Sequence, residues 1–395
     1  MIANIMKALR WPTLEGRRIE LDFARGVAIL LACGWHFNQV RTGIAPLDWL
    51  LVPGRTMGWA GVDLFFVLSG FLIGGILFSE FEKEGGFRPG RFLIRRAFKI
   101  WPVLYAFLIL QLLLDQHPWR TYFLQCLFHV QNFMVTPLSH LWSLGVEEQF
   151  YLAFAILYAL VIAIFGSPRA MPWFLGALMI LPLLARLIAV AANIDSSAMM
   201  QTQYRIDALA CGVGLRYVHQ YHRHLFDDIA SRKPFLAACW VAGSVMVSRT
   251  YVNGDFMHSA GYTLVYLSAA AFLLFCYDLP AITARPLAIK IISHIGLFSY
   301  AIYICQYAAV RPAIALVGTL HLSETPSAIL KITLDYSGAF IVAIMVTILI
   351  ERPMLMLRDF LAPEPRPRSQ SKGLLESPAA IGRPQQHPRS ADGIA

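Results

Sequence analysis

The sequence is poor in charged residues. Asp, Glu, Lys and Arg make up 14% of its 395 residues, whereas they form about a quarter of a soluble domain. Hydrophobic residues make up 57% and occur in runs about as long as a helix that crosses a bilayer. This scarcity of charge excludes a set of soluble domains. The long continuous runs also differ from the short alternating segments of a membrane β-barrel.

The cysteines show no pattern that would indicate metal or redox chemistry. The six of them are Cys33, Cys126, Cys211, Cys239, Cys276 and Cys305. Most lie inside apolar runs, and no two have the spacing of a metal site or a redox motif. We therefore interpret them as small buried hydrophobic residues, and we predict neither a bound metal nor a bound cofactor. The sequence also contains no internal repeat.

The net charge of +9 does not indicate nucleic acid as a partner. Most Lys and Arg residues flank apolar runs, which is where they act as topology signals on cytoplasmic loops. We therefore predict a lipid bilayer as the environment and no nucleic-acid partner. The expected location is the cell inner membrane, which the chain would cross several times.

We predict an all-α, polytopic membrane bundle of about ten transmembrane helices. The apolar runs place the spans near residues 21–40, 58–81, 100–115, 141–165, 172–192, 204–221, 234–249, 259–277, 291–317 and 333–351. Of the 33 Lys and Arg residues, 23 fall in segments assigned to the inner side, five in outer segments and five within or at the ends of spans. This asymmetry predicts that both termini are cytoplasmic.

The predicted domain organisation is simple. Residues 1–20 are a short, basic cytoplasmic N-terminus, and residues 21–358 form the transmembrane domain. Residues 362–395 are rich in Pro, Arg and Ser and contain few large apolar residues. Such a composition cannot bury enough apolar surface to fold, so we predict a disordered cytoplasmic tail.

The first span carries three ionisable residues, Asp22, Arg25 and His36. Charge inside a membrane is costly, so such residues usually face a bundle interior and mark a pathway or a reaction site. Arg25 and His36 are eleven residues apart, which is about three helical turns and 16 Å, so they share a face. Asp22 lies three residues before Arg25 and shares that face too. The span therefore presents one polar stripe.

The fourth span begins with a second polar stripe. Four residues spaced three, four and four apart share one helical face, namely His140, Ser143, Glu147 and Tyr151. In the predicted topology, Glu147 and His36 both lie in the outer half of the membrane. We therefore predict that they form an oriented acid–base pair. The alternative is a buried contact that only holds two helices together.

Three basic residues, Arg95, Arg96 and Lys99, precede the third span. They are consistent with a positive-inside anchor and equally with a phosphate site, because clustered arginines bind phosphate oxygens in pairs. In the second span, Gly70 and Gly74 form a pair of small residues that lets another helix approach closely. Spacing alone assigns no chemistry to the remaining charges at span ends, which are consistent with structural ion pairs. These charges are Asp63, Arg205 and Asp207.

Several motifs together resemble the membrane-bound acyltransferase 3 family, along nearly all of residues 18–358. Arg25 and His36 are similar to the signature of its first span. The run Gly61-Val62-Asp63-Leu64-Phe65-Phe66-Val67-Leu68-Ser69-Gly70-Phe71-Leu72-Ile73 closely matches its second span. Further matches in the same order are residues 95–102, Trp142-Ser143-Leu144 with Glu147 and Phe150-Tyr151, residues 205–209, and Ser299-Tyr300 with Tyr303.

The resemblance implies an acyltransferase for groups other than amino-acyl groups. It would transfer an acyl group, commonly acetyl, from cytoplasmic acyl-CoA to a hydroxyl of a carbohydrate or lipid-linked glycan. His36 would deprotonate the acceptor, and Glu147 would stabilise the imidazolium. A covalent acyl-His36 intermediate is the open variant. The candidate substrate-binding residues are Arg25, Asp63, Ser69, Arg95, Arg96, Lys99, Ser143, Tyr151, Arg205 and Asp207.

The chain departs from the family pattern at two residues. Lys99 replaces the usual arginine, which keeps the charge but loses the planar fork. Gln306 stands where many members carry a histidine, so no role of that histidine is carried over. We also expect the chain to lack the periplasmic esterase-like domain of some members and to work as the membrane unit alone.

Two other functions compete with the acyltransferase. The first is a transporter or flippase with a proton relay through His36 and Glu147. The sequence shows no matched pair of Gly/Pro-broken spans in its two halves, which is the usual indication of a transporter site. The second is a non-catalytic membrane scaffold. A scaffold gives no reason for placing Arg25, His36 and Glu147 within spans.

Overall fold

The computed structural model describes residues 11–114, 119–308 and 310–364. Within these ranges it contains helices and no strand, which confirms the all-α prediction. The helices are α2 (Ile19–Phe37), α3 (Ala45–Met57), α4 (Gly61–Glu84), α5 (Pro89–Leu114), α6 (Trp119–Leu127), α7 (Trp142–Phe165), α8 (Met171–Ala191), α9 (Ile206–Tyr221), α10 (Arg223–Ser231), α11 (Lys233–Arg249), α12 (Tyr262–Cys276), α13 (Pro280–Thr283), α14 (Leu287–Leu297), α15 (Ser299–Cys305), α16 (Val310–Thr319), α17 (Glu324–Val346) and α18 (Arg352–Leu361). Most of the predicted tail, residues 365–395, and residues 1–10 lie outside the described part.

Each predicted span coincides with helical structure. Six helical stretches are long and apolar enough to cross a membrane, and a bent pair, α14 with α15, would make a seventh. The six are Ala45–Glu84, Pro89–Leu113, Ser139–Phe165, Pro168–Ala191, Met257–Cys276 and Glu324–Leu361. The remaining three predicted spans correspond to α2, which carries three charged residues, and to the shorter helices α9 and α11. The multi-pass bundle is confirmed, and the count of ten stays a prediction.

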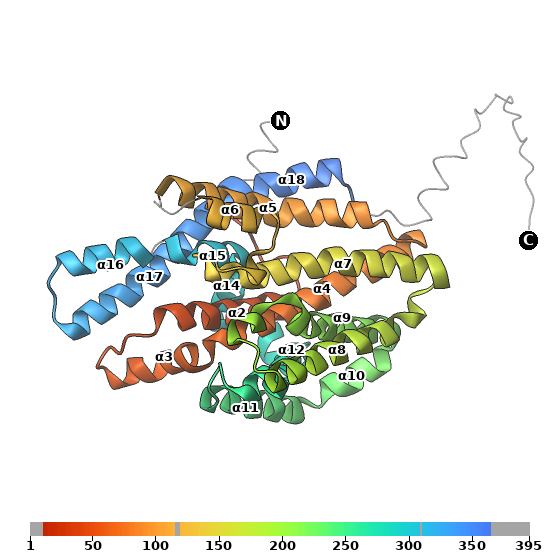
Figure 1. The fold of residues 1–395 in the computed structure, drawn as a ribbon, viewed down its shortest axis with the longest axis horizontal. Coiled ribbons are helices and arrows are strands. Elements are labelled where there is room, and N and C mark those ends of the chain that lie inside the picture. The colour runs from red at the N-terminus through yellow and green to blue at the C-terminus, as the bar shows by residue number, and fades with distance from the viewer. Residues whose placement is uncertain (1–10, 115–118, 309, 365–395) are drawn as a thin grey trace, which may run out of the picture.

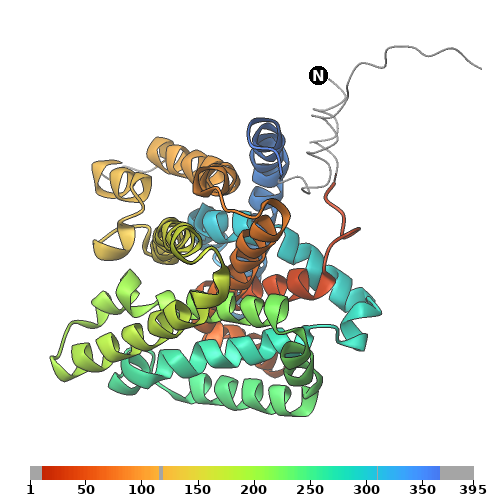
Figure 2. The ribbon, with the colours of Figure 1, turned by 90° about the vertical axis from the view of Figure 1, so that its right-hand side faces the viewer.

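Helix α4 is central to the bundle. Figures 1 and 2 show it passing through the middle, with α5 and α18 on one side and α8 to α12 on the other. It packs against α2, α7, α9 and α12. The hairpin of α16 and α17 projects from one end of the molecule (Figure 1). Because α4 touches so many helices, its small residues decide how closely the bundle can pack.

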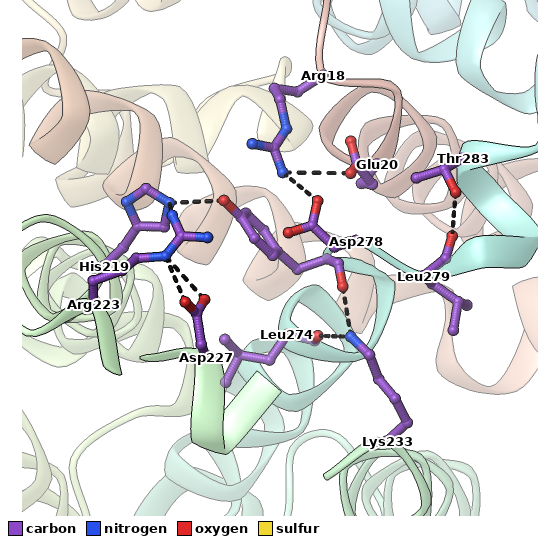
Figure 3. Close-up of polar contacts among 11 residues, drawn as sticks. Arg18, Glu20, His219, Arg223, Asp227, Lys233, Leu274, Asp278, Leu279 and Thr283 are labelled. Atoms are coloured by element: carbon purple, nitrogen blue, oxygen red, sulfur yellow. Dashed lines mark hydrogen bonds and ion pairs between the residues drawn. The ribbon is translucent and has the colours of Figure 1, made fainter. Parts of the chain in front are cut away.

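Segments predicted to lie on the inner side meet in the structure. Figure 3 shows one such meeting, where the start of α2 joins the ends of α9 and α12. There Arg18 pairs with Asp278 at 2.9 Å, and the ring of His219 forms a 2.7 Å hydrogen bond with the hydroxyl of Tyr277. Lys233 donates to the carbonyl oxygen of Tyr277. All five residues belong to segments, or span ends, that the topology places on the same side.

Two more contacts connect the other inner segments. Gln220 at the end of α9 donates to Glu82 at the end of α4, over 2.6 Å. Arg95 in α5 pairs with Asp359 in α18 at 3.2 Å. The loops after the second and sixth predicted spans, and the segment after the tenth, therefore gather on one side of the bundle. This arrangement agrees with the sidedness predicted from the basic residues.

Helices α4 and α9 touch backbone to backbone. A Cβ atom added at Gly70 would lie 2.0 Å from the carbonyl oxygen of Leu209, and one added at Gly212 would lie 2.1 Å from that of Val67. Each glycine thus admits the backbone of the partner helix, which is the usual device for close helix packing in membranes. The predicted close approach at Gly70 is confirmed.

Helices α2 and α14 meet in the same way. A Cβ atom at Gly26 would lie 2.0 Å from the carbonyl oxygen of Ile292, and one at Gly296 would lie 1.9 Å from that of Asp22. This contact fixes α14, and therefore the bend that follows it, against the polar stripe of α2.

The α4–α9 contact predicts a large difference between two glycines of α9. In Gly212→Val the new side chain meets backbone of α4, so we expect the protein to lose about 3 kcal/mol of stability, near the upper end for an overpacked core. Gly214→Val is the matched control, because a Cβ at Gly214 meets nothing within 4 Å. Thermal unfolding of both variants in detergent measures the difference. Equal unfolding temperatures would contradict the backbone contact.

Candidate active site

A cavity of about 620 Å³ is lined in part by residues of the segments predicted to lie on the inner side. Its wall comes from the segment before α2, from α2, α4, α5 and α7, from the bent pair α14 and α15, and from α18 with the turn before it. Eight Lys, Arg and Glu side chains line it, six basic and two acidic: Arg17, Arg25, Arg96, Lys99, Arg352, Arg358, Glu147 and Glu351. The cavity therefore attracts anions.

Asp22 joins two of these arginines. Its carboxylate accepts two 2.7 Å hydrogen bonds from Arg17 and one 3.0 Å hydrogen bond from Arg25, and its side chain is 2% exposed. The predicted common face of Asp22 and Arg25 is confirmed by this contact. The hydrogen bonds to Asp22 also raise the pKa of Arg17, which keeps this guanidinium charged. Because one carboxylate neutralises only one of the two arginines, the group of three keeps a net positive charge that a ligand can use.

Lys99 forms an ion pair with Glu351 across the cavity. Glu351 ends a short π-helical segment, Thr347–Glu351, between α17 and α18. Such segments often occur at functional sites, because the extra residue per turn redirects side chains. Here the segment turns both Glu351 and Arg352 toward the cavity.

Glu147 lies at the inner wall of the cavity, where hydroxyl groups hold its carboxylate. The hydroxyl of Ser69 donates to one oxygen at 3.2 Å, and that of Tyr151 donates to the other at 2.6 Å. Arg96 donates to the same Tyr151 hydroxyl at 2.7 Å and lies 4.4 Å from the centre of its ring. Four predicted site residues from three helices therefore lie together here. Within α7, Tyr151 reaches Glu147 because it follows it by one helical turn.

The bend between α14 and α15 brings further polar groups into the cavity. The two helices meet at an angle of 59°, and Ser299, Tyr300 and Tyr303 just after the bend line the wall. Irregular backbone is tolerated at membrane depth where it borders a cavity. The Tyr303 hydroxyl lies 2.6 Å from that of Ser143 and also donates to the carbonyl oxygen of His140. The helical structure within the predicted span over 291–317 is therefore bent after Leu297.

His36 does not line this cavity. Its Nδ1 atom lies 2.7 Å from the hydroxyl of Tyr307, whose ring centre is 4.7 Å from that of His140. The predicted direct contact between His36 and Glu147 is therefore wrong. The reason is that α15 and the turn after it insert Tyr303 and Tyr307 beside α2 and α7.

Three candidate substrate-binding residues lie in buried ion pairs away from the cavity. Asp63 pairs with Arg205 at 2.8 Å, and Asp207 pairs with Arg186 at 2.7 Å. The guanidinium of Arg205 also lies 3.9 Å from the centre of the Tyr262 ring. These residues connect α4, α8, α9 and α12, and their charges compensate each other.

Arg95 also differs from its predicted position. It does not line the cavity, and it pairs with Asp359 at 3.2 Å and Glu364 at 3.1 Å. Arg96 and Lys99 line the cavity, whereas Arg95 contacts residues of α18 and of the segment after it. Arg95 thus fastens α18 to α5, beside the cavity entrance.

Sequence reasoning missed several residues of the site. Arg17 counted only as a topology signal, although it lies five residues before Asp22. Glu351 and Arg352 carried no motif, and only the turn between α17 and α18 directs them inward. Tyr307 had no signal beyond its position near the family motif at Tyr303.

These features define a multi-pass membrane protein with a cationic cavity that ends at a hydrogen-bonded carboxylate. The chain belongs to the acyltransferase 3 family: the family's sequence model, described as an acyltransferase domain, matches residues 18–352. The predicted membership and the predicted acyltransferase class are both confirmed.

Several proteins named as O-acetyltransferases are similar to this chain. It is 25% identical over 364 residues to the peptidoglycan O-acetyltransferase OatA of Listeria monocytogenes, a match that covers 85% of this chain and 55% of the relative. It is 26% identical over 318 residues to the O-acetyltransferase OatA of Staphylococcus aureus, covering 73% and 49%. The chain thus spans about half the length of the curated relatives it matches. No solved structure matches it.

The buried ion pairs predict that Asp207 supports the fold. In Asp207→Asn the guanidinium of Arg186, which is fully buried, loses its countercharge. We expect a loss of about 3–5 kcal/mol, as for other broken buried pairs. The matched control is Asp228→Asn, which breaks an exposed pair with Arg232 and should change little. A fully stable Asp207→Asn protein that fails to bind substrate would instead support the predicted substrate role.

Proposed function

We propose that this protein transfers an acyl group, commonly acetyl, from cytoplasmic acyl-CoA to a hydroxyl of a carbohydrate or lipid-linked glycan at the inner membrane. The observation that carries the proposal is the cavity, whose six cations surround a passage from the inner side to Glu147. An acyl-CoA has phosphate groups at one end and a long narrow arm that carries the acyl group. The phosphates would match the cations of the cavity, and the arm would reach its deep end. The names of the similar O-acetyltransferases support a glycan hydroxyl as acceptor.

The thioester end of the donor would enter the cavity first, and its phosphate-bearing end would follow. Arg17, Arg25 and Lys99 lie along the passage and would contact the phosphates, because guanidinium and ammonium groups form strong charge-assisted hydrogen bonds to them. The thioester would then reach the end formed by Ser143 and Glu147. In this arrangement Glu147 is a positioning residue, since its contacts with Ser69, Tyr151 and Arg96 shape the deep end.

The acceptor would approach from the other side of Tyr303 and Tyr307, where His36 lies. His36 would take the proton of the acceptor hydroxyl, the oxygen would attack the thioester carbonyl, and the carbon–sulfur bond would break to release the CoA thiolate. If Nδ1 of His36 carries a proton and donates it to Tyr307, Nε2 is the free base. Tyr307 would then select the reactive tautomer.

Transport is less well supported than acyl transfer. A proton relay through His36 and Glu147 requires that they communicate, and each is bonded to other residues. Among the described helices one pair is sharply bent, whereas a transporter site is usually formed by matching broken spans.

Removal of the proposed base should abolish transfer. We expect His36→Ala to reduce acyl-CoA turnover in the presence of membrane glycan by about 10²–10⁴-fold, the usual contribution of a general base. The unfolding temperature should stay unchanged. His294→Ala is the control, because His294 lies outside the cavity and bonds the carbonyl oxygen of Lys290. Full activity of His36→Ala would remove His36 from the mechanism.

When acyl-CoA is supplied without acceptor, direct transfer and a covalent intermediate predict different labelling of the protein. We expect protein incubated with labelled acyl-CoA alone to remain unlabelled, because direct transfer needs the acceptor hydroxyl as nucleophile. Mass spectrometry of the intact protein and its peptides provides the measurement. A stable or trappable acyl group on His36 would show that the histidine acts as a nucleophile.

A further inference from the structure

A second chamber adjoins the donor cavity. It has a volume of about 510 Å³, and its walls come from α2, α4, α5, α9, α18 and the residues just after α18. Arg96, Lys99 and Arg358 line both spaces. The two spaces therefore adjoin at these three cations.

Arg216 in α9 also lines the second chamber, and it differs from three other arginines within or at the ends of predicted spans. Arg25, Arg186 and Arg205 each form an ion pair with a buried aspartate. In the described part of the chain, no carboxylate lies within ion-pair distance of Arg216. Its guanidinium donates to Gln220 at 3.1 Å, and its buried Nε atom has no hydrogen-bond partner.

Helix α4 provides room for this arginine. A Cβ atom at Gly75 would lie 3.1 Å from Nε of Arg216, and one at Gly74 would lie 3.1 Å from its Cβ atom. The guanidinium also lies 5.5 Å from the centre of the Phe71 ring. The side chain is therefore packed in a defined position between α4 and α9, with its charge toward the chamber.

The charges around the second chamber do not balance. Eight charged residues line it, six basic and two acidic: Lys83, Arg95, Arg96, Lys99, Arg216, Arg358, Glu80 and Glu364. Glu80 binds Arg91, which is not among the lining residues, at 2.7 Å, and Glu364 binds one of the six cations, Arg95, at 3.1 Å. A partly buried cation without a countercharge is costly, so an anionic ligand would account for Arg216.

We propose that the second chamber binds the phosphate-bearing nucleotide end of acyl-CoA, with Arg216 as a phosphate ligand. This inference rests on the proposed acyl-CoA donor. CoA carries phosphate at two separate positions, a diphosphate and a ribose phosphate, and the two adjoining cationic spaces match this spacing of charge along one ligand. Arg216 would determine donor recognition without touching the reacting atoms.

The test uses CoA and adenosine 3′,5′-bisphosphate as probes of the purified, full-length protein. Isothermal titration should show that Arg216→Gln weakens the binding of both by about tenfold, because one charge-assisted hydrogen-bonding group is lost. Arg216→Lys should retain part of the affinity. The unfolding temperature of ligand-free Arg216→Gln should not fall, since the substitution removes an uncompensated charge.

Arg223→Gln is the matched control. Arg223 lies on the same side of the bundle, pairs with Asp227 at 2.9 Å and lines neither space (Figure 3). Its loss should leave both affinities unchanged. If the unmodified protein binds CoA and Arg216→Gln binds both probes equally well, the second chamber is not the nucleotide site. If the unmodified protein binds no CoA at all, the proposed donor is wrong as well.

Discussion

The cost of placing charge inside a membrane bundle governs this structure. Asp22 illustrates it: its single carboxylate holds Arg17 and Arg25 together at the wall of the cavity. Arg186 and Arg205 are compensated by aspartates in the same way. Because these charges are matched within the protein, the positive charge that remains is concentrated in the cavity and in the chamber beside it, where a phosphate-bearing ligand can use it.

Two of the segments that line the cavity depart from regular helix geometry. The pair α14 and α15 bends by 59°, and a π-helical segment joins α17 to α18. Both irregularities direct polar side chains inward, including Tyr303 and Glu351. In a bilayer such irregular backbone is tolerated only where protein or a cavity satisfies its polar groups. In these two places the irregular backbone supplies polar side chains to the cavity of the proposed reaction.

The tyrosines of this region divide the proposed reaction between two sides. Tyr303 bonds Ser143 on the donor side, and Tyr307 bonds His36 on the other. A base on one side and a carboxylate on the other would let the donor and the acceptor approach from opposite faces of the membrane. Because His36 lies on the other side of these tyrosines, Glu147 takes its hydrogen bonds from Ser69 and Tyr151 and not from His36.

Much of the fold was predictable because it depends on local patterns. Apolar runs located the helices, and the basic loops predicted which ends gather. The spacing of Glu147 and Tyr151 predicted that they share a helical face, and the structure shows a hydrogen bond between them. The bend after Leu297 was not predictable in this way, because the apolar run continues through it. Beside this bend, Gly296 lies in close contact with the backbone of α2, a contact between segments far apart in the sequence.

By itself, therefore, the sequence determined the membrane bundle, the family and most residues around Glu147, because each follows from hydropathy, helical spacing or a motif. Only the tertiary structure decided which charges neutralise each other. Asp63 and Arg205 are far apart in the chain, yet they form a buried pair, whereas Arg216 has no such partner within the described residues. Whether a charge is compensated depends on helices brought together in space, and no local pattern carries that information.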